Sequence, residues 1–233
     1  MIILVLPVAI LQKSTRVLYN RPMRFSTIFF DLDDTLYPSS TGLWAAIKER
    51  MNIYMRDMLQ IPADEVPALR EQYYKMYGTT LRGLQARHTV DVDDFLAFVH
   101  DVPLQDILTP NPLQREIIAS LPQRKLVFTN ADLHHAQRIL AVLQLDDLFE
   151  TIIDVNAVSP YCKPNPEAFA IAQELANEPD PRKCVMIDDL PRTTRAALEV
   201  GMASILYGTE EPTEDASGVF IDWNHLPILV ADE

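Results

Sequence analysis

Short apolar segments alternate with longer segments of helical periodicity along most of this chain. Runs rich in β-branched and aromatic residues, each bounded by polar or turn residues, lie at 26–30, 125–129, 151–155, 183–187 and 203–207. Apolar residues at helical spacing occupy 131–145, 165–177 and 191–201. Strands that alternate with helices predict a parallel sheet covered on both faces. We therefore expect an α/β fold built on a Rossmann-like parallel sheet.

One long segment interrupts this alternation, because it contains helical patterns and no convincing strand. Helical patterns are found at 41–59, 64–78, 79–88 and 90–101. We expect a small all-helical cap over 41–108, inserted into a catalytic core formed by 24–40 and 109–233. Residues 1–23 are predicted to be a dispensable extension.

Composition and charge limit the classes of partner. The net charge is −13, which argues against a nucleic-acid partner because such binding needs clustered Lys and Arg. The apolar run at 2–11 is too short to span a bilayer and lacks the basic lead and cleavage site of a signal peptide. Cys162 and Cys184 are the two cysteines, too few for a disulfide framework. We expect a cytoplasmic protein without a membrane partner.

Polar residues stand where the predicted strands end, and ligands of open parallel sheets bind beyond those carboxyl ends. These residues are Asp31 and Asp33 after the first strand, Thr129 and Asn130 at the end of the second, Lys163 in the loop after the third, and Asp188 and Asp189 after the fourth. We expect them to converge on one crevice.

The residue types in this crevice predict phosphate chemistry. Carboxylates without Cys or His favour a hard cation such as Mg²⁺, which would offset their mutual repulsion. Lys163 and Thr129 would bind phosphate oxygens, while Asn130 either positions the substrate or ends its strand. Asp31 would attack phosphorus, and Asp33 would act as general acid and base. The alternative is a solvated acidic turn.

Four segments also carry a resemblance to a known family. DLDDTLY, FTNAD, KPNPEAF and MIDD stand in the order and strand context of the motifs of haloacid dehalogenase-like hydrolases. The resemblance implies that Asp31 is the nucleophile and Asp33 the acid/base, and Thr129 and Lys163 match the phosphate binders. It also implies a metal ion held by the Asp31 carboxylate, the Asp33 carbonyl and the last acidic pair. Within that pair, Asp189 would bind directly and Asp188 through water.

Four segments are also similar to a narrower subfamily. DLDDTLYPSSTGLW, YGTTLRGL, DDFLAFVHD and FTNAD look like the pyrimidine 5′-nucleotidases, which implies a nucleoside monophosphate such as UMP or CMP as the substrate. A phosphatase or phosphomutase for a sugar phosphate would have the same core. A haloacid dehalogenase would need neither Mg²⁺ nor Asp33, and a phosphate-accepting signalling module would be shorter. The choice between monomer and homo-oligomer stays open.

The remaining candidates are side chains near this crevice. His134 and His135 are adjacent on a helix and point about 100° apart, so we expect helix surface rather than a metal site, with at most one of them at the rim of the crevice. We expect no site role for His100. Arg82 and Gln85 are candidates for binding polar groups of the substrate. Five aromatic side chains either stack on a nucleobase or form the core of the cap: Trp44, Tyr54, Tyr73, Tyr74 and Tyr77.

Overall fold

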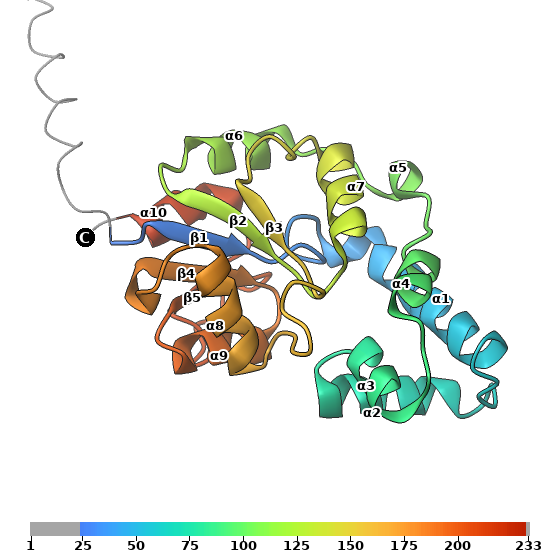
Figure 1. The fold of residues 1–233 in the computed structure, drawn as a ribbon. Coiled ribbons are helices and arrows are strands. Elements are labelled where there is room, and N and C mark those ends of the chain that lie inside the picture. The colour runs from blue at the N-terminus through green and yellow to red at the C-terminus, as the bar shows by residue number, and fades with distance from the viewer. Residues whose placement is uncertain (1–23, 232–233) are drawn as a thin grey trace, which may run out of the picture.

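A six-stranded parallel sheet forms the centre of the computed structural model, which describes residues 24–231 (Figure 1). The strand order is β3-β2-β1-β4-β5-β6. The strands are β1 (Thr27–Phe30), β2 (Arg124–Phe128), β3 (Thr151–Ile153), β4 (Cys184–Asp188), β5 (Ala203–Tyr207) and β6 (Gly218–Phe220). This sheet confirms the predicted α/β fold, while the prediction for residues 1–23 lies outside the described part of the chain.

Helices cover both faces of the sheet because successive side chains of a buried strand point to opposite faces. In β1, Ile28 and Phe30 belong to the apolar cluster that includes α6, α7 and α10, whereas Phe29 belongs to the cluster with α8 and α9. These helices are α6 (Pro112–Ser120), α7 (Leu133–Leu143), α8 (Pro166–Leu175), α9 (Pro191–Glu199) and α10 (Leu226–Val230). Short 3₁₀ turns lie at η4 (Pro181–Lys183) and η5 (Trp223–His225).

Residues 39–107, which we call the helical segment, lie between β1 and β2 in the sequence and beside the carboxyl ends of the central strands (Figure 1). The helical segment contains η3 (Ser39–Thr41), α1 (Leu43–Asp57), α2 (Val66–Tyr77), α3 (Thr80–Arg87), α4 (Val92–Val99) and α5 (Leu104–Ile107) before α6. Helices α2 and α3 approach closely at Gly83, where an added Cβ would lie 2.3 Å from the Cβ of Tyr73. Glycine is therefore required at this contact. None of the helices in residues 24–231 combines the length and apolarity needed to cross a membrane.

Two arginines join the helical segment to the sheet-bearing part. Arg82 of α3 donates to the main-chain oxygens of Val155 and Tyr161, each at 2.7 Å. In the opposite direction, Arg192 of α9 donates to the main-chain oxygen of Gly78 at 2.9 Å. The two parts are thus held by hydrogen bonds that start on both sides of the contact.

A buried thiol lies at the same contact. Cys162 is fully buried, and its Sγ lies 3.4 Å from the main-chain oxygen of Tyr77 at the end of α2. Gly78 follows with a φ of +87°, and a Cβ at this position would lie 2.7 Å from the Cys162 Sγ. The helical segment therefore packs directly on the loop that carries Lys163.

Candidate functional site

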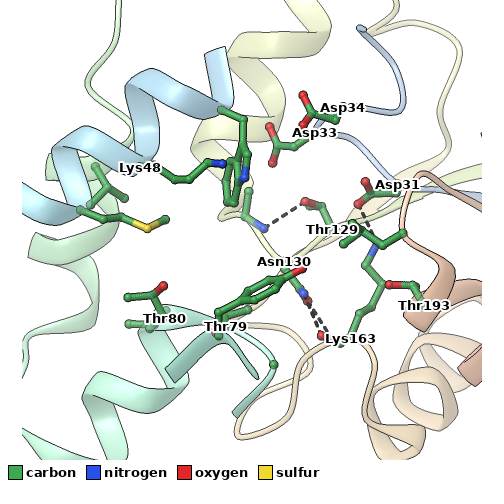
Figure 2. A pocket seen from close by; sticks show the side chains of 18 of the residues that line it. Asp31, Asp33, Asp34, Lys48, Thr79, Thr80, Thr129, Asn130, Lys163 and Thr193 are labelled. Atoms are coloured by element: carbon green, nitrogen blue, oxygen red, sulfur yellow. Dashed lines mark hydrogen bonds and ion pairs between the residues drawn. The ribbon is translucent and has the colours of Figure 1, made fainter. Parts of the chain in front are cut away.

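A cavity of about 280 Å³ lies between the carboxyl ends of the central strands and the helical segment. Figure 2 shows Asp31, Thr129 and Lys163 on one side of it, with Lys48 and Thr80 on the other. The structure brings all of the predicted site residues to the wall of this cavity: Asp31, Asp33, Thr129, Asn130, Lys163, Asp188 and Asp189. They come from strand ends that are neighbours in the sheet, at the position where the strand order reverses and ligands bind in open α/β sheets.

A buried ammonium group lies between two carboxylates at the inner end of the cavity. The Lys163 Nζ is 2.6 Å from the Asp31 Oδ1 and 2.7 Å from the Asp188 Oδ2. Burial alone would lower the pKa of Lys163, but Asp188 and Asp31 outweigh burial and raise it. The Thr35 hydroxyl donates to the Asp31 Oδ2 at 3.2 Å. Asp31 is therefore held at both oxygens.

The three carboxylates of Asp31, Asp188 and Asp189 fit a hard divalent cation. Their ligand oxygens lie within 4.8 Å of one another. Burial raises the pKa of Asp31 well above its ordinary value, with Lys163 opposing the effect. Burial and the neighbouring Asp188 raise the pKa of Asp189 to about 7. One ammonium does not neutralise this set, and an all-oxygen donor set suits Mg²⁺.

The second predicted catalytic acid, Asp33, is held apart from this cluster. Its Oδ1 accepts a hydrogen bond from the Tyr37 hydroxyl at 2.7 Å and lies 3.2 Å from the His135 Nε2. Burial alone would raise the pKa of Asp33, but His135 and Tyr37 outweigh burial and lower it. Asp31 and Asp33 therefore have opposite electrostatic environments although they are two residues apart.

The prediction that His135 lies on the helix surface is wrong. Its side chain is fully buried, and its ring stacks on His100 with centroids 3.9 Å apart. The angle between adjacent helix residues excludes a shared metal ion, but it does not say which way each ring points. Asp132 starts α7 by accepting from the His135 N–H, which puts His135 in the turn that faces the Asp33 loop. His100 also lines the cavity, while His134 is exposed as expected.

Asn130 has a specific role in holding the lysine loop. Its amide nitrogen donates to the Lys163 main-chain oxygen at 2.9 Å, and its amide oxygen accepts from the Lys163 N–H at 2.8 Å. Thr129 is buried, and its hydroxyl oxygen accepts from the Ala131 N–H at 3.0 Å. The Thr129 hydroxyl keeps its own hydrogen for donation into the cavity.

The outer part of the cavity combines aromatic, apolar and cationic side chains from the helical segment. Trp44 and Tyr74 line it, whereas Tyr54, Tyr73 and Tyr77 do not. Met51, Leu81, Phe95, Leu96 and Val99 form an apolar wall. Further polar side chains that sequence reasoning did not identify also line the cavity: Lys48, Arg70, Thr79 and Thr80 from the helical segment, and Arg192 from α9. Single polar residues on a helix are usually solvated, so the sequence gives little indication that these side chains face a cavity.

Arg82 and Gln85, the candidates for binding polar groups of the substrate, do not line the cavity. The guanidinium of Arg82 is occupied by the main-chain oxygens described above and by the Gln85 Oε1 at 2.7 Å. The arginine of YGTTLRGL therefore joins the two parts of the chain.

Comparison with known proteins gives a family and several relatives. The model of the haloacid dehalogenase-like hydrolases matches residues 25–201. Phosphate metabolism protein 8 of Saccharomyces cerevisiae is 32% identical over 197 residues, which are 78% of this chain and 61% of the yeast protein. The chain thus spans less than two thirds of the length of that relative.

Solved structures share the fold at low sequence identity. A protein described as a predicted phosphoglycolate phosphatase from Haemophilus somnus superposes with a TM-score of 0.63 at 21% identity, over 90% of this chain and 99% of that one. The L-2-haloacid dehalogenase of Xanthobacter autotrophicus with chloropropionic acid covalently bound gives 0.56 at 18% identity, over 88% and 98%. These two proteins act on different substrates by their descriptions, so the fold alone does not choose the reaction.

Proposed function

The chain belongs to the haloacid dehalogenase-like hydrolase family, and on this premise we propose that it is a Mg²⁺-dependent phosphomonoesterase acting through an aspartyl-phosphate. The observation that carries the proposal is the pair of carboxylates with different partners. Asp31 contacts the Lys163 ammonium and the acidic cluster, and Asp33 contacts Tyr37 and His135. A dehalogenase needs one nucleophilic carboxylate, and the second carboxylate and the acidic cluster favour phosphate transfer.

In this mechanism, Asp31 attacks phosphorus, so that an Oδ–P bond forms and the ester P–O bond breaks. Asp33 donates a proton to the leaving oxygen and later accepts one from the water that attacks the phosphorus and releases Asp31. Lys163 and Thr129 bind the phosphate oxygens during both steps. The lowered pKa of Asp33 keeps it ionised in the free enzyme, and the negative charge of a bound phosphate would raise this pKa.

Asp31, Asp189 and Asp188, with the main-chain carbonyl of Asp33, would hold Mg²⁺. The bound ion would supply positive charge beside the phosphate and offset the repulsion between these carboxylates. Lys163 already neutralises part of that charge in the free site.

We further propose that residues 41–108 act as a cap over a core of 24–40 and 109–233, and that the substrate is a nucleoside monophosphate such as UMP or CMP. The support is the outer cavity, where two aromatic rings and an apolar wall face the space next to the phosphate site. These surfaces suit the flat faces of a nucleobase. The same part of the cavity is also lined by Lys48, Arg70, Thr79 and Thr80, which offer polar partners to sugar hydroxyls, and for this reason the sugar phosphates are the second candidate.

The test is phosphate release from UMP, CMP, AMP, GMP and several sugar phosphates, each with Mg²⁺ and with EDTA. We expect Mg²⁺-dependent release that is fastest with UMP and CMP, and none from the Asp31→Asn variant. Release from sugar phosphates alone would overturn the substrate and leave the reaction in place. Chloride release from 2-chloropropionate in EDTA, without phosphate release from any ester, would overturn the reaction itself.

A further inference from the structure

We propose that His135 is a positioning residue that orients the Asp33 carboxylate for proton transfer, with His100 and Asp132 holding His135 in place. The inference rests on the proposed function, because it needs Asp33 to act as an acid and a base. It adds a role for a buried histidine pair that the reaction itself does not use.

The first observation is that both contacts to the Asp33 carboxylate are made to the same oxygen. The Tyr37 hydroxyl and the His135 Nε2 both face Oδ1, at 2.7 and 3.2 Å. Among residues 24–231, no hydrogen bond reaches Oδ2. A carboxylate fixed through one oxygen presents the other in a defined direction. The geometry therefore makes Oδ2 the oxygen that exchanges the proton with substrate or water.

The second observation concerns the hydrogen on the imidazole. The His135 Nε2 faces a carboxylate oxygen, which only accepts hydrogen bonds, so Nε2 carries the hydrogen. The buried Nδ1 has no partner within the described part of the chain. Placing the ring hydrogen on Nε2 gives Asp33 a directed donor and leaves an unpaired lone pair at Nδ1. The ring thus leaves one buried nitrogen without a hydrogen bond and keeps the hydrogen bond to Asp33.

The third observation is that the ring of His135 is held on its other sides. Its plane is stacked on His100 at an angle of 17°, and the His100 Nδ1 lies 2.5 Å from the Asp132 Oδ2. The other oxygen of Asp132 accepts from the His135 N–H at 2.9 Å. One carboxylate thus fixes the backbone of one histidine and the ring of the other, and the His135 ring has no room to turn.

This arrangement also connects Asp33 to the helical segment. His100 ends α4, while His135 belongs to α7 on the sheet side. Arg138 of α7 donates to the main-chain oxygen of His100 at 2.8 Å, which holds α4 against α7. The orientation of the Asp33 carboxylate therefore depends on the packing of α4 against α7.

The experiment compares His135→Leu with wild type on p-nitrophenyl phosphate and on UMP, with Mg²⁺. The p-nitrophenolate group leaves without a proton, whereas the later attack of water needs Asp33 as a base. We expect His135→Leu to keep a full first-turnover burst of p-nitrophenol and to lose about 10- to 100-fold in steady-state turnover, the scale of loss for a misplaced catalytic group. His135→Gln, which keeps a donor near the Nε2 position, should recover part of that loss.

His134→Leu is the matched control, because His134 is the exposed neighbour on the same helix and its variant should behave as wild type. Steady-state turnover of His135→Leu within twofold of wild type overturns the positioning role alone. An equal loss of burst and turnover, in proportion to the loss of native circular dichroism, also overturns it, because this is the result of damaged packing. If wild type releases neither p-nitrophenol nor phosphate from UMP, the proposed function fails and the positioning role fails with it.

Discussion

Replacing Arg82 with methionine tests whether this residue joins the two parts of the chain or binds substrate. Arg82 is 7% exposed, and its guanidinium donates to the main-chain oxygens of Val155 and Tyr161. Methionine keeps most of the side-chain length and removes every donor. The variant therefore isolates the hydrogen bonds from the packing of the aliphatic stem.

The expected loss follows from what happens to each acceptor. Val155 is fully buried, so its carbonyl loses its charged partner without access to water, at a cost of about 1–3 kcal/mol. Tyr161 is 37% exposed, so its carbonyl regains water and the loss is about 1 kcal/mol. Burial also lowers the pKa of Arg82, which shows that the charge is partly desolvated, and removing it returns some free energy. We expect a net loss of about 1–3 kcal/mol in the free energy of unfolding.

The assay is urea denaturation followed by circular dichroism, together with the KM for the best substrate. With a denaturant slope of about 3 kcal/mol/M, the loss moves the urea midpoint down by roughly 0.3–1 M. Arg87→Met is the control, because Arg87 is exposed on the same helix and should move the midpoint by less than about 0.2 M. An unchanged midpoint for Arg82→Met, combined with a large rise in KM, would refute the structural role and restore Arg82 as a substrate contact.

Three further results are expected. Without metal, the folded-state pKa of Asp189 is about 7, above its unfolded value of about 4. The stability that Asp189 contributes in its protonated form is therefore complete below about pH 4 and is lost by about pH 7. Because the ion needs the carboxylate, the Mg²⁺ affinity measured by titration calorimetry should rise with pH over the upper part of this range. Gly83→Ala should lower stability in thermal melts by about 1–3 kcal/mol or more, because of the 2.3 Å approach to Tyr73, whereas a stability equal to wild type would show that α2 and α3 can separate. Asp33→Asn should lower kcat by about 10²- to 10⁴-fold while the circular dichroism spectrum stays native, and near-normal turnover would remove Asp33 from the mechanism.

Strand patterns were sufficient to predict the sheet, because buried parallel strands are short, apolar and bounded by turn residues. Because all the strands are parallel, their carboxyl ends lie at one edge of the sheet, and β2, β1 and β4 are neighbours there. The gathering of Asp31, Lys163 and Asp188 at one cavity follows from that topology and needs no tertiary detail. The nine-residue helix α6 was not predicted, although Asn111 and Pro112 start it with a side-chain cap and a proline in the first turn.

The roles of side chains that contact the site residues or join distant segments, such as His135 and Arg82, were not predictable in the same way. Whether His135 faces water or Asp33 depends on how α7 is rotated about its own axis relative to the sheet. Sequence periodicity predicts which side of a helix is apolar, but it does not fix this rotation closely enough to place a residue at the border of the apolar side. Arg82 lies in the segment YGTTLRGL, which resembles the pyrimidine 5′-nucleotidases, yet its guanidinium donates to carbonyls of a loop more than seventy residues later in the chain. Such contacts arise from packing between distant segments, and a single sequence does not encode their distances.

The burial of the two cysteines provides a way to observe two different motions in the unmodified protein. Cys162 is enclosed by the end of α2 and by Gly78, so its thiol becomes accessible when the helical segment lifts away from the lysine loop. Cys184 lies within β4 and is fully buried, so its thiol becomes accessible when the sheet itself opens. Under excess thiol reagent, the faster of two labelling phases would measure the equilibrium for lifting and the slower one the equilibrium for unfolding. A ligand that binds only while the helical segment is packed on the lysine loop would slow both phases by the same factor, whereas a ligand that still binds after the segment lifts would slow only the second.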